Sequence, residues 1–491
     1  MEFSSMLNFL ENKAILVTGG AGFLAKIFAE KVLRSQPKVK KVYILLRADD
    51  NKAASLRFQN EVLEKDLFDV LKQKMGENFN SFISEKVTVV PGDITWEDLA
   101  IKDLKLKEEL WSDVDVIVNL AANTKFDERY DVSLSLNTFG AKNILDFAKK
   151  CTNLKVLIQV STAYVSGETN GVVKEVPYDL GESLNGRPGL DIQLEKTLIE
   201  DKLKELHSQG ASQDIIKLTM KDLAMERAKY WGWPHVYVFT KALGEMLLMQ
   251  EKEDIPLVFI RPTIVTSTFK EPFPGWVEGM RTVDSIAIAY GKGRLKCMPG
   301  DPSSIVDVIP ADMVVNAILV AAMAHANDKG NLTIYHVGSS VKNPINFNSV
   351  HEAIFQYFKH HPYVTNNGTP VIVGHVKVLT TMASFKSYIS LRYRLPLKGL
   401  KVANMVLCQS FKGMYMDKRR KLNHLRRLMD IYRPYLFYKG VYDDANTEKL
   451  RNASRDGGIE TDIFYFDPKV VDWKDYFMNI HFPGVVKYVL K

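Results

Sequence analysis

The fold is decided near the start of the chain by Ala14-Ile15-Leu16-Val17-Thr18-Gly19-Gly20-Ala21-Gly22-Phe23-Leu24-Ala25. The first five of these residues form an apolar run without helical period, which predicts a buried parallel strand. Glycines follow at once, and apolar residues then recur at helical spacing as far as Leu33. A strand, a glycine turn and a helix in this order are the setting of a dinucleotide-binding fingerprint. A plain strand-to-helix turn is the alternative interpretation.

Each small residue in this turn has a separate physical task. Gly19 permits the tight turn, Gly22 lets the backbone approach a diphosphate, and Ala25 allows the helix to pack closely on the strand. The helix N-terminus then offers unpaired N–H groups to the phosphates. We therefore expect cofactor contacts from Thr18, Gly19, Gly20, Ala21, Gly22, Phe23 and Leu24.

The second predicted strand, from Lys41 to Leu46, indicates which dinucleotide binds. It ends in Arg47, at the place where proteins that bind NAD usually carry an acid for the ribose hydroxyls. A guanidinium there suits a 2′-phosphate in charge and in bidentate geometry, so the sequence favours NADPH. A solvated charge at a strand end is the alternative, and Asp49 and Asp50 follow closely.

Three more apolar runs predict strands at 86–90, 114–119 and 156–160. Strands alternate with helical patterns to about residue 160, which predicts an α/β fold with a doubly wound parallel sheet of the Rossmann type. Residues that follow these strands are placed to contact a ribose or a flat ring. We expect further cofactor contacts there from Asp93, Ile94, Asn119 and Ala121, with simple turn formation as the alternative for Asp93.

The reacting groups are predicted from Tyr237-Val238-Phe239-Thr240-Lys241. On a helix, the i, i+4 spacing places the Tyr and Lys side chains on one face. The pKa of a free Tyr is about 10, and a neighbouring ammonium lowers that pKa. We predict that Tyr237 is the catalytic acid, and that Lys241 lowers its pKa and contacts the ribose of the cofactor. A half-exposed helix surface is the alternative for this spacing taken alone.

Hydroxyls at the end of the fifth predicted strand complete this arrangement. Ser161 and Thr162 follow Val160, at the edge where open α/β sheets bind ligands. Thr162, or else Ser161, would hold a carbonyl oxygen by a hydrogen bond while negative charge develops on it. Asn137 lies on a preceding helical pattern, and we expect it either to hold a proton-relaying water or to make only a local polar contact.

These residues resemble the extended short-chain dehydrogenase/reductases over about residues 10–365. Within that class the chain resembles the plant-type alcohol-forming fatty acyl-CoA reductases over nearly its whole length. The stretches that carry this resemblance run from Lys125 to Tyr130, Ser161 to Val165, Arg261 to Val265, Phe269 to Trp276 and Phe466 to Lys469.

The resemblance implies two successive reductions that use NADPH. A long-chain acyl-CoA thioester becomes a bound aldehyde, and the aldehyde becomes a primary alcohol, with release of CoA. The catalytic triad of the family corresponds to Thr162, Tyr237 and Lys241, and the resemblance adds Pro262 and Ile264 to the expected cofactor contacts. The alcohol would serve the synthesis of wax, suberin or related lipids.

Two rival functions stay open at this point. One is another extended reductase, which acts on a sterol, a flavonoid or a free aldehyde and does not consume a thioester. The other is a protein without catalytic activity that senses NADP(H) or acts as a membrane scaffold. A scaffold has no need of Thr162, Tyr237 and Lys241 together, so their presence favours an enzyme.

The chain is predicted to contain two domains. Residues 1–365 form the NADPH-binding reductase domain, and residues 366–491 form a smaller, mainly helical domain typical of the fatty acyl-CoA reductases. The boundary falls in the loop from Pro362 to Pro370,. Insertions at about 168–235 and 265–310 are expected to cap the substrate site. Helical patterns at 194–206 and 220–229 indicate that the first insertion is a lid that retains the aldehyde.

Composition restricts the partners and the compartment. The chain has 491 residues and a net charge of +7, but it contains no nucleic-acid-reading motif, so nucleic acid is not an expected partner. Cys151, Cys297 and Cys408 are few and far apart, which suits a reducing compartment and gives no metal-ligand spacing.

About a dozen residues precede the first strand, so no targeting peptide is expected. The longest uncharged apolar run, 313–327, is too short to span a bilayer and predicts a core helix.

The C-terminal region combines apolar and basic residues. Residues 376–411 are apolar and aromatic with scattered cations, and the run Lys418-Arg419-Arg420-Lys421 follows. This combination suits a membrane interface, whereas helices that pack on the reductase are the alternative. Together with the resemblance, it predicts peripheral contact with the cytosolic face of the endoplasmic reticulum membrane; a cytoplasmic protein is the alternative.

Overall fold

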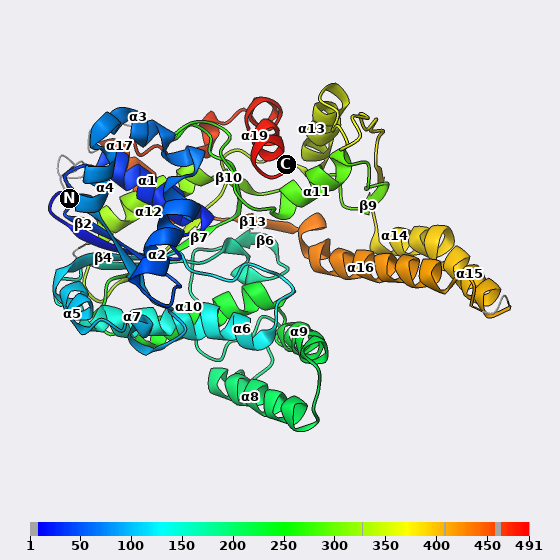
Figure 1. Ribbon diagram of the computed structural model, residues 1–491, viewed down its shortest axis with the longest axis horizontal. Coiled ribbons are helices and arrows are strands. Elements are labelled where there is room, and N and C mark those ends of the chain that lie inside the picture. The colour runs from blue at the N-terminus through cyan, green and yellow to red at the C-terminus, as the bar shows by residue number, and fades with distance from the viewer. Residues whose placement is uncertain (1–7, 327, 407–408, 457–462, 491) are drawn as a thin grey trace.

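The computed structural model describes residues 8–326, 328–406, 409–456 and 463–490. A parallel sheet forms its centre, with the strand order β3-β2-β1-β4-β5-β7-β11 (Figure 1). The five strands predicted from sequence are all present within one residue of the expected bounds, and the doubly wound parallel sheet is confirmed. The strands are β1 (Ala14–Thr18), β2 (Lys41–Leu46), β3 (Val87–Pro91), β4 (Val114–Asn119), β5 (Val156–Val160), β7 (Leu257–Pro262) and β11 (Leu332–Val337).

Helices cover both faces of the sheet, which explains why its strands are apolar throughout. In β1, Ile15 and Val17 belong to the core that contains α1 (Phe23–Ser35) and α12 (Ala311–His325). Ala14 and Leu16 point to the opposite face and share a core with α5 (Leu104–Asp113) and α7 (Gly140–Lys150). The run predicted as a core helix is the buried helix α12, and none of the described helices is long and apolar enough to cross a bilayer.

The strand order reverses between β1 and β4, so a crevice opens at the carboxyl ends of these strands,. Beside it, α10 (Val236–Glu251) packs on η6 (Ser135–Phe139) and α7. Smaller elements surround this centre: α2 (Asn51–Phe58), α3 (Asp69–Met75), α4 (Phe79–Lys86), α6 (Tyr130–Leu134), β8 (Ile264–Thr266), α11 (Thr282–Gly291), β9 (Cys297–Pro299), β10 (Val308–Pro310) and α13 (Phe347–His360).

The first predicted insertion contains β6 (Asn170–Val173) and two helices that extend from the lower side of the molecule in Figure 1. These helices are α8 (Ile192–Ser208) and α9 (Gln213–Tyr230). Both were predicted from sequence, and both are longer than predicted because Asp191 and Ser212 cap them further upstream,.

The C-terminal region has two parts. One is an arm that projects from the body at the right of Figure 1, built from α14 (Met382–Ile389), α15 (Leu395–Val406) and α16 (Lys412–Leu436). The other returns to the body, where β13 (Lys439–Tyr442) pairs with β6 and the core residues Tyr476 and Phe477 join the cluster that contains α1 and α12. The remaining elements are β12 (Lys377–Leu379), α17 (Ala445–Asp456), α18 (Trp473–Asp475) and α19 (Phe482–Tyr488). The C-terminal region therefore shares the core of the reductase domain.

Candidate active site

The glycine turn has the geometry that close approach of a ligand requires. Gly19 has a φ of +66°, and a Cβ on this residue would lie 2.8 Å from the Cα of Ala121. A Cβ on Gly22 would lie 2.9 Å from the carbonyl oxygen of Gly19. A residue with a side chain at either position would therefore be strained and would block access to the backbone of the turn. The tight turn predicted at Gly19 is confirmed.

The turn borders a cleft of about 320 Å³ at the carboxyl ends of the first strands. Exposed glycine backbone at the N-terminus of α1 and two arginines line it. These residues fit a nicotinamide dinucleotide, with its diphosphate at the turn and its adenosine at the arginines. The predicted contacts that line the cleft are Gly19, Gly20, Ala21, Gly22, Arg47, Asp93, Ile94 and Ala121.

Other predicted contacts do not line this cleft. Thr18 and Asn119 are buried beneath the turn, where the Thr18 hydroxyl donates to Asn119 Oδ1 and accepts from the N–H of Ala121. Asn119 Nδ2 donates to the side chain of Gln159 at 2.7 Å. Their polar atoms are already bonded within the protein, so these two residues support the turn from below.

Four further predicted contacts also do not line the cleft. The ring of Phe23 stacks on Trp276 with centroids 5.3 Å apart, and Leu24 packs against the same core. The carbonyl of Pro262, at the end of β7, accepts from the Thr162 hydroxyl at 3.5 Å. Ile264 lines the neighbouring pocket instead, so it faces the reacting groups.

Two arginines form the cationic end of the cleft. Arg57, which was not predicted, pairs with Glu61 at 2.8 Å and donates to the carbonyl of Arg47. Among the described residues, no carboxylate pairs with the side chain of Arg47. Asp93 Oδ1 accepts from the N–H and the hydroxyl of Thr95, both at 2.9 Å; this is the turn-forming role given as its alternative.

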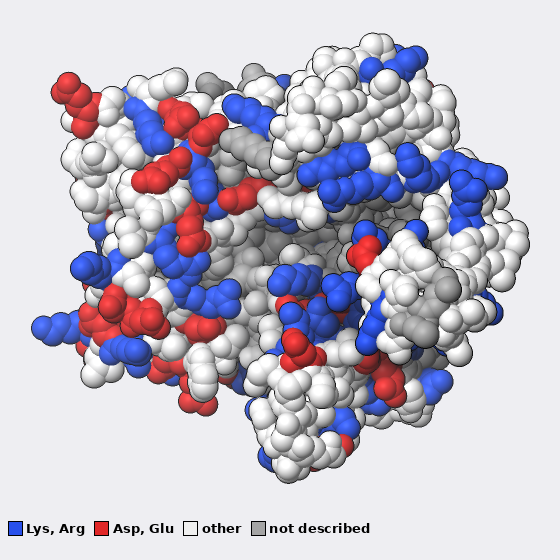
Figure 2. All heavy atoms as spheres, turned by 45° about the vertical axis from the view of Figure 1, so that its right-hand side comes forward, with Lys and Arg blue, Asp and Glu red and all other residues white. Residues whose placement is uncertain are grey.

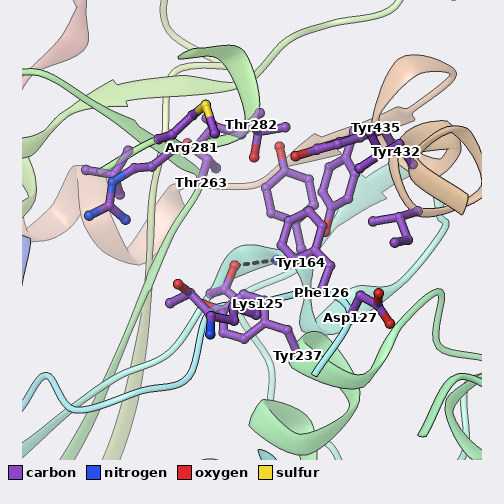
Figure 3. Close-up of a pocket in the computed structure, with 17 residues that line it drawn as sticks. Lys125, Phe126, Asp127, Tyr164, Tyr237, Thr263, Arg281, Thr282, Tyr432 and Tyr435 are labelled. Atoms are coloured by element: carbon purple, nitrogen blue, oxygen red, sulfur yellow. Dashed lines mark hydrogen bonds between the residues drawn. The ribbon is translucent and has the colours of Figure 1, made fainter. Parts of the chain in front are cut away.

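The three predicted catalytic residues come together where β5 ends and α10 begins. Thr162 and Tyr237 line a pocket of about 430 Å³ (Figure 3). Lys241 lies one helical turn after Tyr237, and its Nζ donates to the carbonyl of Val160 at 2.7 Å. Ser161 is buried and does not line the pocket. Thr162 is therefore the hydroxyl beside the phenol.

The electrostatics of this group differ from the prediction. Burial raises the pKa of Tyr237 to about 12, although the charge of Arg281 and a hydrogen bond with Thr162 act in the opposite direction. Burial lowers the pKa of Lys241 to about 8. The prediction that Lys241 lowers the pKa of Tyr237 is corrected, because the ammonium is directed at Val160 and the nearby charge comes from Arg281. At neutral pH Tyr237 is thus a protonated phenol, which can donate a proton.

Asn137 serves the framework of the site. It is buried in η6, where its Oδ1 accepts from the N–H of Asn123 at 2.9 Å. Its Nδ2 donates to the carbonyl of Asn123 and to the hydroxyl of Thr240, each at 3.0 Å. These bonds fasten the loop after β4 to α10, which agrees with the local polar contact given as the alternative to a water relay.

The far wall of the pocket comes from the C-terminal arm. Leu428, Ile431, Tyr432 and Tyr435, all on α16, line it together with Phe126 and Tyr164 (Figure 3). The ring of Phe126 stacks on His235, with centroids 4.1 Å apart, and on Tyr435 at 5.3 Å. The Tyr435 hydroxyl is 2.7 Å from His235 Nε2, and burial lowers the pKa of His235 to about 3, so this imidazole is neutral.

The predicted lid is in a different place. Among the described residues that line the pocket, none comes from α8 or α9. The first insertion reaches only the rim, where Asp222 of α9 and Asp127 both bind Arg427 of α16. The pocket is instead covered by α16, through Leu428, Ile431, Tyr432 and Tyr435, and by the loop before α11. The second predicted insertion, which includes this loop, does supply Met280, Arg281 and Thr282.

A narrow apolar cavity of about 40 Å³ adjoins the pocket. Ile264, Thr282 and Tyr435 line both spaces. The cavity continues between α11 and α13, and its other lining residues include Val283, Ile286, Met298, Val350 and Ile354. This small apolar space would suit aliphatic atoms that lie next to the pocket.

Several residues of the site escaped sequence reasoning. Arg281, Tyr435 and His235 have no motif of their own, and their role depends on packing between distant segments. Arg57 had a usable signal, because it lies in the last turn of the short helix that follows Arg47. Cys297 packs against α14 and carries no sign of a reactive thiol, since burial raises its pKa, whereas Cys408 lies outside the described residues.

Comparison with known sequences agrees with this geometry. A family model described as "Male sterility protein" matches residues 17–318 through its NAD-binding part, and a second model of the same description matches residues 392–491. The alcohol-forming fatty acyl-CoA reductase of Simmondsia chinensis is 61% identical over 490 residues, which cover 100% of this chain and 99% of that protein. Fatty acyl-CoA reductase 1 of Arabidopsis thaliana is 52% identical, with 99% of each chain covered.

Solved structures share the fold at low sequence identity. The reductase domain of a nonribosomal peptide synthetase from Mycobacterium tuberculosis superposes with a TM-score of 0.56 at 17% identity, covering 99% of this chain and 94% of that one. The terminal reductase domain of the myxalamid biosynthetic pathway gives 0.51 at 16% identity, with 90% and 85% covered. These structures therefore support the overall fold of the chain.

Proposed function

Because the chain belongs to the male sterility protein family and, within it, to the alcohol-forming fatty acyl-CoA reductases, we propose that it reduces long-chain acyl-CoA to a primary alcohol in two steps with NADPH and releases CoA. The observation that carries the proposal is the pocket itself. It places Thr162 and Tyr237 beside a cleft suited to a dinucleotide and next to a narrow apolar cavity.

The two hydroxyls of the pocket would hold the oxygen of the reacting carbonyl. Thr162 and Tyr237 can both donate a hydrogen bond to this oxygen as negative charge develops on it. The reduced nicotinamide supplies the hydride when it is bound. In the first step the carbon–sulfur bond breaks and the sulfur leaves as CoA with a proton. In the second step Tyr237 donates its proton to the aldehyde oxygen, which becomes the alcohol.

The preference for NADPH is supported by Arg47 and Arg57. Both line the adenosine end of the cleft, and β2 ends without the acid that would bind the ribose hydroxyls of NADH,. Lys241 points to the carboxyl end of β5, where it would contact the ribose next to the nicotinamide and would carry protons to Tyr237. The alcohol would enter wax, suberin or related lipid synthesis.

Products identified by mass test the proposal. Purified protein is incubated with acyl-CoAs of several chain lengths and NADPH, and we expect fatty alcohol and free CoA. NADPH oxidation with a free aldehyde, but no loss of thioester, would identify another extended reductase. Binding of NADPH with every acyl-CoA left intact would support the non-catalytic alternative.

The C-terminal arm supports a peripheral location on the cytosolic face of the endoplasmic reticulum membrane. Leu391, Val402, Met405 and Val406 on the arm are between 61% and 73% exposed. The basic residues Lys418, Arg419, Arg420 and Lys421 are also exposed on α16. In Figure 2, which brings the arm forward, Lys and Arg gather around the hollow beside it, and most Asp and Glu lie on the other side. An apolar surface flanked by cations suits an anionic lipid interface.

Vesicle sedimentation tests this location. We expect the protein to bind vesicles of phosphatidylserine and phosphatidylcholine, and a variant with Val402, Met405 and Val406 changed to Ser to bind at least about 10-fold more weakly, because burial of a CH₂ group contributes about 0.8 kcal/mol. The matched control changes Leu104 and Leu194, exposed apolar residues of the body, to Ser. Equal binding by both variants would favour the cytoplasmic alternative.

A further inference from the structure

Arg281 is a cation of the pocket that the catalytic scheme above does not use. It immediately precedes α11 and lines the pocket together with Thr162 and Tyr237. In Figure 3 its guanidinium extends away from the group formed by Tyr164, Tyr432 and Tyr435. The guanidinium carbon lies 4.5 Å from the centroid of the Phe23 ring. Phe23 is the first residue of α1 and directly follows Gly22, so the guanidinium lies near the N-terminus of this helix, although the Phe23 ring itself is buried against Trp276.

The guanidinium has no carboxylate partner among the residues that the structure describes. Its Nη2 donates to the carbonyl of Glu278 at 3.3 Å, and its Nε is buried without a hydrogen-bond partner. A buried guanidinium with an open donor is costly unless an anion satisfies it. A ligand that brings negative charge would therefore bind here with favourable energy.

The acids near Arg281 already have other partners. The Glu278 carboxylate pairs with Lys26 at 2.5 Å. Asp284 accepts from the backbone N–H of Arg281, and its other oxygen is 3.0 Å from His481 Nε2. Neither carboxylate is directed at the guanidinium, so the site keeps a net positive charge at the junction of the cleft and the pocket.

The diphosphate of NADPH is the group that we expect between the cleft and the pocket. The adenosine of a dinucleotide lies toward Arg47, and its nicotinamide must reach Tyr237, so the diphosphate passes the glycine turn between them. The side chain of Arg281 lies between Phe23, at the turn, and Tyr237, whose pKa its charge affects. A diphosphate with two negative charges would satisfy the open Nε and the remaining guanidinium donors.

We propose that Arg281 binds the diphosphate of the dinucleotide from the side opposite the glycine turn, and that this contact places its charge beside Tyr237. The proposal rests on the proposed function only in taking NADPH as the cofactor. It adds a cofactor-binding residue from the loop before α11 to a site otherwise built from the ends of the first strands.

Binding measurements on the full-length protein without acyl substrate test this role. We expect Arg281→Met to raise the Kd for NADPH at least about 10-fold, since a hydrogen bond to a charged group contributes about 1.5–3 kcal/mol. The Kd for 2′-phospho-ADP-ribose, which keeps the diphosphate, should rise equally. Adenosine 2′,5′-bisphosphate lacks the diphosphate and should bind both proteins alike. Arg281→Lys should recover part of the loss.

Lys270→Met is the matched control, because it removes an exposed charge from the same loop and should leave all three Kd values unchanged. Three results would overturn the proposal: an unchanged Kd for NADPH in Arg281→Met, an equal loss of adenosine 2′,5′-bisphosphate binding, or a loss of CoA binding alone, which would assign the cation to the substrate. If the native protein binds NADPH but leaves acyl-CoA intact, the proposed function is wrong. The role of Arg281 in binding the diphosphate would not be affected by that result.

Discussion

The cofactor cleft and the reactive pocket lie at the same edge of the sheet, but they are built in different ways. The cleft is made by backbone and short side chains that directly follow β1, β2, β3 and β4, with α2 adding Arg57. The pocket is made by side chains from segments that range from Thr124 to Tyr435. The cleft therefore depends on local turn geometry, and the pocket depends on how distant segments pack.

Substitutions in the two regions should therefore have different effects. A change in the pocket at any residue other than Arg281 should impair reduction while the dinucleotide still binds, because the cleft has its own supports in Thr18, Asn119 and Gln159. A change in the cleft should weaken cofactor binding for every substrate alike. Measuring the dinucleotide Kd and the rate of reduction on the same variants therefore tests whether the two regions act independently.

The largest effect is expected at the phenol. Tyr237→Phe should lower kcat by about 100-fold to 10,000-fold, the usual contribution of a general acid, because Tyr237 lines the pocket and its phenol interacts with the Thr162 hydroxyl. The Kd for NADPH should stay within about threefold. A variant that retains most of its activity would show that the proton comes from another group.

Arg47→Ala tests the cleft and should have a smaller effect, which is a loss of affinity for NADPH. The Kd for NADPH is expected to rise about 10-fold to 100-fold, the range for a lost hydrogen bond to a charged group, whereas the Kd for NADH should hardly change. Arg57→Ala is the comparison variant. It should raise the Kd for NADPH by less, because the Arg57 guanidinium is already paired with the Glu61 carboxylate. Equal losses for NADPH and NADH would refute the 2′-phosphate assignment.

Tyr435→Phe tests the contribution of the C-terminal arm to the pocket. The substitution leaves His235 Nε2 buried without its partner, which costs about 1–3 kcal/mol,. We expect kcat/KM for acyl-CoA to fall about 10-fold with an unchanged Kd for NADPH. Tyr438→Phe, which removes a buried hydroxyl outside the pocket, controls for general loss of stability. If Tyr435→Phe also weakened NADPH binding, the pocket and the cleft would not be independent.

The smallest effect is a pH dependence that arises from Lys241. Burial lowers its pKa to about 8, so the ammonium loses its proton as the pH rises through that value. We expect the Kd for NADPH to increase a few-fold between pH 7 and pH 9.5, and the Lys241→Met variant to bind weakly with no such change. A flat profile in the native protein would mean that the lysine stays charged.

The same contrast explains what could be predicted from the sequence. The five strands and the glycine turn were predicted within one residue, because period, composition and turn chemistry are local properties. The Tyr-x-x-x-Lys helix was recognisable since i, i+4 spacing survives in any helix. Arg281, His235 and Tyr435 were not recognisable, because nothing in their neighbouring residues indicates that His235 and Tyr435 pack on Phe126 or that Arg281 lies over Phe23. The lid was misplaced for the same reason: helical patterns reveal α8 and α9 but not the surface on which they pack.

The stoichiometry of a single-substrate reaction tests the central claim most directly. Purified protein is given one long-chain acyl-CoA and excess NADPH, and oxidised NADPH, free CoA and alcohol are measured together. If Thr162 and Tyr237 serve both reductions in one pocket, two NADPH are consumed for each CoA and each alcohol, and free aldehyde does not accumulate. One NADPH per CoA with aldehyde as the released product would contradict this account.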